Sequence, residues 1–136
     1  MNPMKLEREE IFFINALDEA TGVIAKDCLV SQRTITFLVK NGEMGKTIGT
    51  KGQKIKSLSK KLNRRVEIIG FYDDPKEFFA KAMPDIEIKE VKKEDSSLVL
   101  RVNSTDKRKI LNETGKFKRI KRLAERNYSI GSVKLR

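Results

Sequence analysis

The sequence has 136 residues, of which 30 are Lys or Arg and 19 are Asp or Glu, so that its formal net charge is +11. It contains no histidine and one cysteine, Cys28. These counts exclude Ser-His-Asp and Cys-His nucleophiles, an imidazole general base, an internal disulfide and multi-cysteine metal sites. No apolar run approaches the roughly 18 residues of a membrane span, and the start of the chain lacks the apolar core of a signal peptide. We therefore expect a soluble, cytoplasmic protein without cofactors, whose positive charge favours a polyanionic partner.

The first half of the sequence predicts the order helix, strand, strand, helix, helix, strand. Apolar residues at helical spacing indicate the first helix, and Gly22 follows it as a stop signal. A short gap between the first two strands favours an antiparallel hairpin. Gly49–Gly52 interrupts the next two helices. We place the six elements at residues 7–20, 23–30, 33–39, 43–48, 53–62 and 65–71.

The second half repeats this order. Pro75 stands at the favoured first position of a helix, and Glu94–Ser97 predicts a turn between two strands. Thr105 is the predicted N-cap of the next helix. Gly115–Lys118 is expected to interrupt the last two helices, as Gly49–Gly52 does in the first half. We place the six elements at residues 75–83, 86–91, 98–102, 106–112, 119–126 and 128–135.

This internal repeat predicts an α+β fold of two similar domains, residues 1–72 and 73–136. Each copy carries three strands and three helices in about 65 residues, a size that can fold alone but with a small core. Positive charge is concentrated in both copies. Between Gly45 and Val66 the sequence has eight Lys or Arg and no acid, and residues 107–126 form a second basic stretch. Segregated charge of this kind suits phosphate binding with release of counterions.

The most informative motif is the segment Gly49-Thr50-Lys51-Gly52 between two helices. Glycine lets a ligand approach the backbone closely, and the start of the following helix adds N–H groups and the positive end of the helix dipole. Lysines in and after the segment would add mobile charge. We therefore predict a clamp for a sugar–phosphate backbone, with Val66 and Ile68 of the last strand packing against bases across a groove.

These residues resemble the KH domain family in its type II order, α-β-β-α-α-β, over nearly the whole chain. Two tandem type II KH domains in so short a chain resemble the archaeal NusA-like transcription termination and antitermination factors. The resemblance implies single-stranded RNA binding by a GxxG loop that clamps about four nucleotides, action on transcribing RNA polymerase, and no enzymatic activity. Carried over by position, the implied RNA-binding residues of the first copy are Lys46, Ile48, Gly49, Thr50, Lys51, Gly52, Gln53, Lys54, Ile55, Val66 and Ile68.

The second copy departs from the GxxG pattern, because Lys118 stands where the second glycine belongs. Its side chain would either obstruct close backbone approach or contact phosphate directly. The surrounding basic residues suit an electrostatic track for RNA. The RNA-binding residues implied here are Gly115, Lys116, Phe117, Lys118, Arg119 and Arg122.

Other features have plainer interpretations. Gly45-Lys46-Thr47 lacks the first glycine of a phosphate-binding P-loop, since position 40 is Lys40. Cys28 is expected as a small buried hydrophobe of a strand. The acid pairs at positions 73–74 and 94–95 are read as solvated turn carboxylates. The phenylalanine pairs at 12–13 and 78–79 are read as packing residues rather than base-stacking ones.

Alternative functions stay open at this point. A ribosome-associated or RNA-processing KH module would carry the same residues. A basic protein-interaction scaffold is a second alternative, because a fold does not fix a function. A small metal-dependent nuclease is a third, although the sequence has no histidine and no convergent carboxylates. The leading expectation is a monomeric RNA-binding transcription factor, with single-stranded RNA and RNA polymerase as partners and no membrane association.

Overall fold

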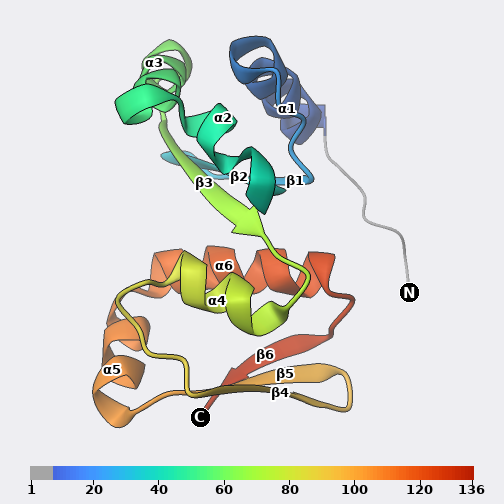
Figure 1. The fold of residues 1–136 in the computed structure, drawn as a ribbon, viewed down its shortest axis with the longest axis vertical. Helices are drawn as coiled ribbons and strands as arrows, with labels where there is room; N and C mark the ends of the chain where they lie inside the picture. The colour runs from blue at the N-terminus through green and yellow to red at the C-terminus, as the bar shows by residue number, and fades with distance from the viewer. Residues whose placement is uncertain (1–7) are drawn as a thin grey trace. The chain divides into compact units, whose positions relative to one another are not determined.

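The computed structural model describes residues 8–136, and for Thr114 it describes the backbone but not the side chain. The described chain forms two compact units, one ending at Phe71 and the other running from Tyr72 to Arg136 (Figure 1). We call them the N-terminal and the C-terminal unit. Each contains three helices and one three-stranded sheet, as the internal repeat predicts.

The N-terminal unit follows the predicted order of elements. Short 3-10 turns at Asn41–Glu43 and Thr50–Gly52 precede its second and third helices. The helices α1, α2 and α3 lie on one face of the sheet (Figure 1). Its elements are α1 (Arg8–Thr21), β1 (Asp27–Val30), β2 (Thr34–Lys40), α2 (Met44–Ile48), α3 (Gln53–Leu62) and β3 (Arg65–Phe71).

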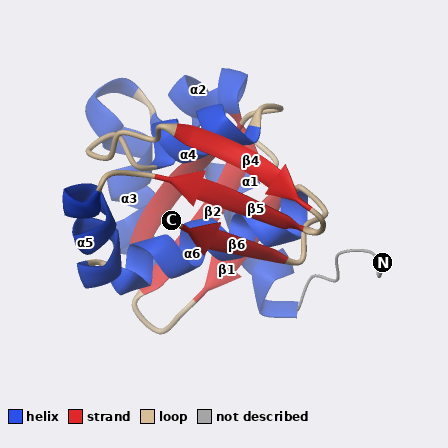
Figure 2. Cartoon of the chain, turned by 90° about the horizontal axis from the view of Figure 1, so that it is seen from below, coloured by secondary structure: helices blue, strands red, loops and turns tan. Residues whose placement is uncertain are grey.

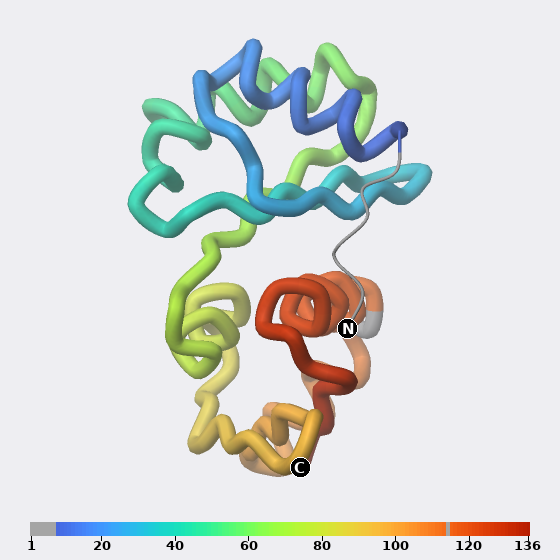
Figure 3. The backbone as a smooth tube through the Cα atoms, turned by 90° about the vertical axis from the view of Figure 1, so that its right-hand side faces the viewer, coloured from blue at the N-terminus to red at the C-terminus, as the bar shows by residue number. Residues whose placement is uncertain are grey.

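The sheet of this unit has the strand order β1-β2-β3. The strands β1 and β2 form the expected antiparallel hairpin, which Figure 3 traces as two adjacent runs. The strand β3 pairs with β2 in parallel, with Ile35 opposite Val66 and Phe37 opposite Ile68. A parallel pair needs a crossover connection, and here α2 and α3 supply it. The glycine segment between these helices therefore lies within the crossover.

Apolar side chains of β2 form the centre of the N-terminal core. Ile35, Phe37 and Val39 are fully buried and pack with Leu17 of α1 and Leu58 of α3. Their alternation along β2 is what a strand with one face toward a helical layer requires. This core holds α3, and with it the glycine segment, against the edge strand β3.

The first strand is shorter than predicted, because β1 begins only at Asp27 and residues 23–25 form a connecting segment. Val23 and Ala25 are buried there, so their apolar pattern reflects burial of a connecting segment. The ladder begins where the Lys26 N–H donates to the Leu38 carbonyl at 2.7 Å. Cys28 of β1 is fully buried, as expected. The helix α1 begins at Arg8, and Glu7, where we placed its start, lies outside the described residues.

The C-terminal unit repeats the topology, with strand order β4-β5-β6, an antiparallel first pair and a parallel second pair. Figure 2 shows its three strands side by side in this order. Phe78, Phe79 and Leu123 are buried at the centre of this unit. Its elements are α4 (Pro75–Ala82), β4 (Glu90–Glu94), β5 (Ser97–Arg101), α5 (Ser104–Asn112), α6 (Thr114–Asn127) and β6 (Ser132–Leu135).

The predicted starts of β4, β6 and α5 in this unit are wrong. The strand expected at 86–91 begins only at Glu90, since the preceding residues form a loop in which Ile88 is buried without strand pairing. The strand expected at 128–135 begins at Ser132, because α6 runs to Asn127 and Ser129, with φ of 54°, turns the chain. The N-cap of α5 is Asn103 rather than Thr105.

The Asn103 side chain accepts a hydrogen bond from the Asp106 N–H at 2.7 Å, which caps α5 two residues earlier than predicted. Asparagine is at least as good an N-cap as threonine. The buried Asp106 carboxylate in turn accepts from the Glu87 N–H at 3.1 Å and so ties α5 to the loop that follows α4. Phe12 also departs from the packing expected of it, because its side chain is 62% exposed whereas Phe13 is buried.

Candidate nucleic-acid interface

The glycine segment Gly49–Gly52 forms a tight turn between α2 and α3 with an unusual backbone. Gly49 has φ of 80° and ψ of 175°, Lys51 has φ of 54° and Gly52 has φ of 72°. Three of the four residues thus have positive φ, which glycine adopts without the penalty of a Cβ. The side chains of Thr50 and Lys51 are exposed at the tip of the turn. The segment therefore presents its backbone and one lysine to solvent.

Lys54 lies against this turn. A Cβ added to Gly49 would stand 2.8 Å from Lys54 Cγ, so the aliphatic part of that side chain passes directly over the glycine. Its ammonium group donates to the Lys46 carbonyl at 3.1 Å, near the end of α2. The glycine thus makes room for a lysine as well as for a turn, and the positive charge of Lys54 is held beside the segment.

The helix α3 begins immediately after the segment. Its N-cap, Gly52, has left-handed backbone angles and provides no side-chain cap. The first N–H groups of a helix lack intrahelical partners and lie at the positive end of the dipole, where an anion is stabilised. The sequence of α3 adds four lysines and no acid. This helix start is therefore suited to phosphate.

A groove of about 1010 Å³ runs beside α3 toward the start of β3. Ile55 of α3, which is half-buried, and Val66 of β3, which is 8% exposed, are the apolar residues that line it. Polar groups of Gln32, Ser57, Ser59 and Asn63 complete its lining. Of the described residues that line the groove none is acidic, and five are cationic: Arg33, Lys56, Lys60, Arg64 and Arg65.

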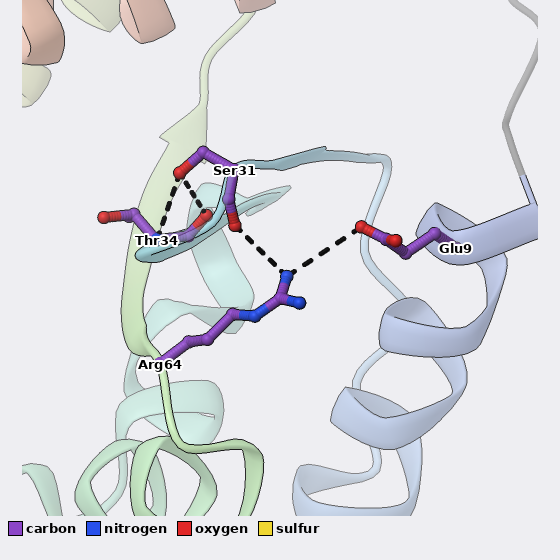
Figure 4. A network of polar contacts seen from close by, with 4 residues as sticks. All are labelled: Glu9, Ser31, Thr34 and Arg64. Carbon is purple, nitrogen blue, oxygen red and sulfur yellow. Dashed lines mark hydrogen bonds and ion pairs between the residues drawn. The ribbon is translucent and has the colours of Figure 1, made fainter.

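Arg64 is held in place by groups from α1 and from the β1–β2 turn, and Figure 4 shows its contacts with Glu9 and Ser31. Its Nη1 donates to the Ser31 carbonyl at 3.1 Å and lies 3.8 Å from the Glu9 carboxylate. Its guanidinium stands 5.2 Å from the centre of the Phe13 ring, a cation–π distance. The β1–β2 turn is itself closed by hydrogen bonds between Ser31 and Thr34, near 3.0 Å. One end of the groove is therefore rigidly built.

The remaining predicted residues of the first copy lie around the segment and the groove. Ile48 ends α2 and is half-buried, and Gln53 is exposed in the first turn of α3. Lys46 is exposed on α2, and its side chain passes close to Gly22, where an added Cβ would stand 3.5 Å from the ammonium group. Ile68 is half-buried against the hydrophobic core and, unlike Ile55 and Val66, is not among the residues that line the groove.

Sequence reasoning missed the cations of the groove as site residues. Lys56 and Lys60 are spaced by four residues and so share a face of α3. That spacing was a usable signal for two of them. Arg33 comes from the hairpin turn, and only the pairing of Arg65 with Arg33, through a hydrogen bond of 2.9 Å, brings it to the groove. No local pattern in the sequence predicts the pairing of Arg65 with Arg33.

The second predicted loop does not exist as a loop. Gly115, Lys116, Phe117 and Lys118 lie in the first turns of α6, which begins at Thr114. The break between α5 and α6 falls at Glu113, with φ of −100° and ψ of 56°. A segment with a single glycine cannot reproduce the run of positive φ seen at Gly49–Gly52, and the helix continues through it.

The basic residues of this segment are therefore arranged on a helix. Lys118 and Arg122, four residues apart, are exposed and share a face of α6. The Arg119 side chain folds back along the helix toward Gly115, where an added Cβ would stand 3.4 Å from the guanidinium group. Lys116 and Phe117 line a separate hollow of the C-terminal unit. The structure gives this copy a basic helix instead of a backbone clamp.

Within residues 8–136, no cluster of three or more Cys, Asp or Glu side chains could hold a metal ion. The helices described in the same range include none long and apolar enough to cross a membrane.

Comparison with known proteins places this geometry in a family. The sequence profile of the KH domain matches residues 8–96, which cover the described N-terminal unit and continue past β4. A crystal structure of APE1850 superposes with a TM-score of 0.79 at 27% identity and covers 96% of this chain and 100% of that one.

Curated relatives carry the name probable transcription termination protein NusA. The protein of Methanococcus vannielii is 31% identical, with 83% of this chain and 68% of the relative aligned. That of Halococcus morrhuae is 30% identical over 90% and 91%, and that of Methanocaldococcus jannaschii 28% identical over 99% and 76%. The chain therefore belongs to the KH domain family, whose members are RNA-binding modules, and within it to the NusA-like proteins of archaea.

Proposed function

We propose that the protein is a transcription termination or antitermination factor that holds single-stranded nascent RNA in the groove of its N-terminal unit. Residues 1–72 and 73–136 are its two KH domains, and RNA polymerase is its protein partner. The observation that carries the RNA site is that α3 begins at an exposed glycine turn and lines a groove with five cations and no acid. The names of the relatives support the role in transcription.

In this proposal the glycine turn binds the sugar–phosphate backbone. Lys51 at the tip of the turn and the first N–H groups of α3 converge on one phosphate, and Lys54 stands beside them. The strand then runs along α3, which is 10 residues long and so spans ~15 Å. Arg33, Lys56 and Lys60 neutralise further phosphates along this path. Such contacts make affinity fall steeply with salt, by ~0.7 in the log–log slope for each phosphate neutralised.

Bases in the groove pack on Ile55 and Val66. Both side chains are aliphatic, so they accept the face of any base and provide apolar burial without discriminating between bases. The amide groups of Gln32 and Asn63 at the groove can bond to base edges. The C-terminal unit contributes an electrostatic track along α6, through Lys118 and Arg122. The clamp and the track are thus chemically different contacts.

The clamp is tested by the double variant Thr50→Asp, Lys51→Asp. Both side chains are exposed, and Asp tolerates the left-handed angles of position 51, so the fold should be unaffected. The change removes one positive charge and adds two negative charges at the proposed phosphate site. We expect affinity for a labelled unstructured RNA to fall by at least tenfold in the full chain. The salt slope should also become shallower.

The matched control is Lys89→Asp, Thr105→Asp, which makes the same two substitutions at exposed positions outside the proposed site. It should bind RNA nearly as the parent chain does, and duplex DNA should compete poorly with both. Equal losses of RNA affinity in the two variants would indicate that RNA binds to a general basic surface rather than to the proposed site. Unchanged binding in the clamp variant would refute the clamp.

The transcriptional role needs a second assay. We expect RNA polymerase, rather than ribosomal particles, to co-purify with the chain, and the chain to change the yield of terminated transcripts from a purified archaeal polymerase. The clamp variant should lose this effect. Co-purification with ribosomal particles and no effect on transcripts would instead favour a ribosome-associated KH module.

A further inference from the structure

The C-terminal unit contains a hollow of about 270 Å³ where α5 ends and α6 begins. Four apolar side chains line it: Met83 and Ile86 from the segment after α4, Ile110 from α5 and Phe117 from α6. Met83 and Ile110 are buried, whereas Ile86 and Phe117 are half-buried and reachable from solvent. The hollow therefore has an apolar floor with one aromatic ring partly open to a ligand.

The remaining lining residues are polar and charged. Lys109 and Lys116 contribute ammonium groups, Asp85 and Glu113 contribute carboxylates, and Asn112 contributes an amide. All but Lys116 are exposed, so they form the rim. The Lys109 ammonium also lies 3.8 Å from the Asp106 carboxylate. Cations, carboxylates and an amide around an aromatic floor provide partners for both a phosphate and the edge of a base.

The position of Phe117 in the repeat is informative. Aligned by their first glycines, Gly49–Gly52 and Gly115–Lys118 place Phe117 where the N-terminal unit has Lys51. In the N-terminal unit this position is exposed at the tip of a turn, whereas in the C-terminal unit it lines a hollow. The helix has removed the backbone clamp and placed a ring at the corresponding position.

We propose that this hollow binds one nucleobase with an exocyclic amine, which is cytosine, adenine or guanine, from the single-stranded RNA held by the N-terminal unit. This inference rests on the proposed function, because the base is taken to come from the RNA that the N-terminal unit binds. The base stacks on Phe117, and its amine donates to the carboxylate of Asp85 or Glu113. Lys109 and Lys116 bind the attached phosphate.

Size and charge favour a base over a protein side chain. A hollow of 270 Å³ lies just below the usual ~300–1,000 Å³ of ligand pockets, so it accepts one ring system rather than a longer ligand. Carboxylates can only accept hydrogen bonds, so at a base edge they favour bases that present an amino group over uracil, which presents a single ring N–H and otherwise acceptors. Paired lysines beside an aromatic ring match a nucleotide, which joins an apolar face to a phosphate. An aliphatic side chain would leave all five polar groups unused.

The first test is a titration of the isotope-labelled full chain with nucleoside 5′-monophosphates, followed by amide chemical shifts. Cytidine and adenosine monophosphates should shift Ile86, Ile110 and Phe117, and uridine monophosphate should shift them less. Inorganic phosphate alone should leave Phe117 unmoved. Equal effects of all three nucleotides and of phosphate, or no shifts at these residues, would overturn the proposal.

The second test uses variants of Phe117 in the full chain. Phe117→Leu keeps an apolar side chain in the hollow but removes the ring, and Phe117→Tyr keeps the ring. Leu should weaken binding of a cytosine-containing single-stranded RNA about tenfold, which corresponds to ~1.4 kcal/mol, and Tyr should preserve it. Leu111→Ala, at an exposed residue of α5 outside the hollow, is the matched control. Equal affinities of the Leu and Tyr variants would overturn the proposal.

The clamp variant of the N-terminal unit separates this inference from the proposed function. If nucleotides shift the hollow while Thr50→Asp, Lys51→Asp leaves RNA binding unchanged, the base site stands and the clamp fails. If the clamp variant loses affinity for RNA but nucleotides cause no chemical-shift changes at the hollow, the proposed function is supported and the base site is refuted. A hollow that responds to an acidic peptide and not to nucleotides would assign it to a protein partner and refute the base site.

Discussion

Replacing Gly49 with alanine tests whether the glycine turn depends on its backbone. At φ of 80° and ψ of 175° this residue occupies a region that is essentially restricted to glycine, and a residue held there against its preference costs ~1–3 kcal/mol. The new Cβ would also stand 2.8 Å from Lys54 Cγ. Lys54 must then move and give up its hydrogen bond to the Lys46 carbonyl, which is worth ~0.5–1 kcal/mol. We expect the free energy of unfolding to fall by ~2–3 kcal/mol.

Urea and thermal unfolding of the full chain, followed by circular dichroism, measure this loss. In a unit of this size 1 kcal/mol shifts Tm by ~4–8 °C, so the transition of the N-terminal unit should fall by ~10 °C or more. Gly45→Ala is the matched control, since Gly45 lies inside α2 and an added Cβ meets nothing within 4 Å. That variant should gain ~0.5–1 kcal/mol from helix propensity.

Lys54→Ala separates the two contributions. Combined with Lys54→Ala, the Gly49→Ala change retains its backbone cost and a 3.2 Å approach to the Cβ of residue 54, but loses the 2.8 Å conflict with Cγ, so the double variant should be more stable than the sum of the single changes by ~0.5–1 kcal/mol. If Gly49→Ala proves as harmless as Gly45→Ala, the strained turn is not a feature of the protein. Strict additivity of the two changes would refute the close packing of Lys54 on the glycine.

Two further predictions concern the C-terminal unit. The Tyr128 hydroxyl donates to the Tyr72 carbonyl, and burial raises the pKa of this hydroxyl above its ordinary value of about 10. Ionisation of this hydroxyl therefore favours the unfolded chain, so the stabilisation that the protonated hydroxyl contributes is complete below pH ~10 and declines as the pH rises further. Tyr128→Phe should flatten the pH dependence of urea unfolding above pH 10. An unchanged profile would contradict the assignment. Asn103→Ala should lower the stability of this unit by ~1 kcal/mol, because the cap of the Asp106 N–H is lost, whereas Thr105→Ala should have little effect. The opposite ranking in thermal unfolding would restore Thr105 as the cap.

The sequence predicts most reliably where local chemistry and tertiary packing agree. The helix α3 and the strand β3 begin and end at the predicted residues, because glycine and asparagine turns bound α3 and β-branched residues fill β3. Asn63, which ends α3 with φ of 52°, is a residue type that accepts left-handed angles. The hairpin of β1 and β2 is predictable for the same reason, since a short polar gap separates two apolar strands.

The errors arise where a residue type is compatible with two structures. Gly115 was expected to open a loop, yet a glycine near a helix start costs only ~1 kcal/mol relative to alanine. The three residues after it are tolerated in a helix, and none of them is a glycine that could supply positive φ. Arg33 shows a different limit. Its place in the groove depends on parallel pairing of two strands that are far apart in sequence, and no local pattern encodes that pairing.

The two repeats differ in how they can contact RNA, and the difference comes from one glycine. Gly52 provides a left-handed N-cap, so α2 and α3 are separated by a turn that exposes backbone and Lys51. Lys118 at the corresponding position favours a right-handed helix, so α6 starts earlier and carries its basic residues on side chains alone. A backbone clamp does not discriminate between bases, whereas a hollow with an aromatic floor and carboxylates at its rim can. On this argument the N-terminal unit supplies most of the affinity for RNA, and the hollow of the C-terminal unit adds a preference for amino-bearing bases.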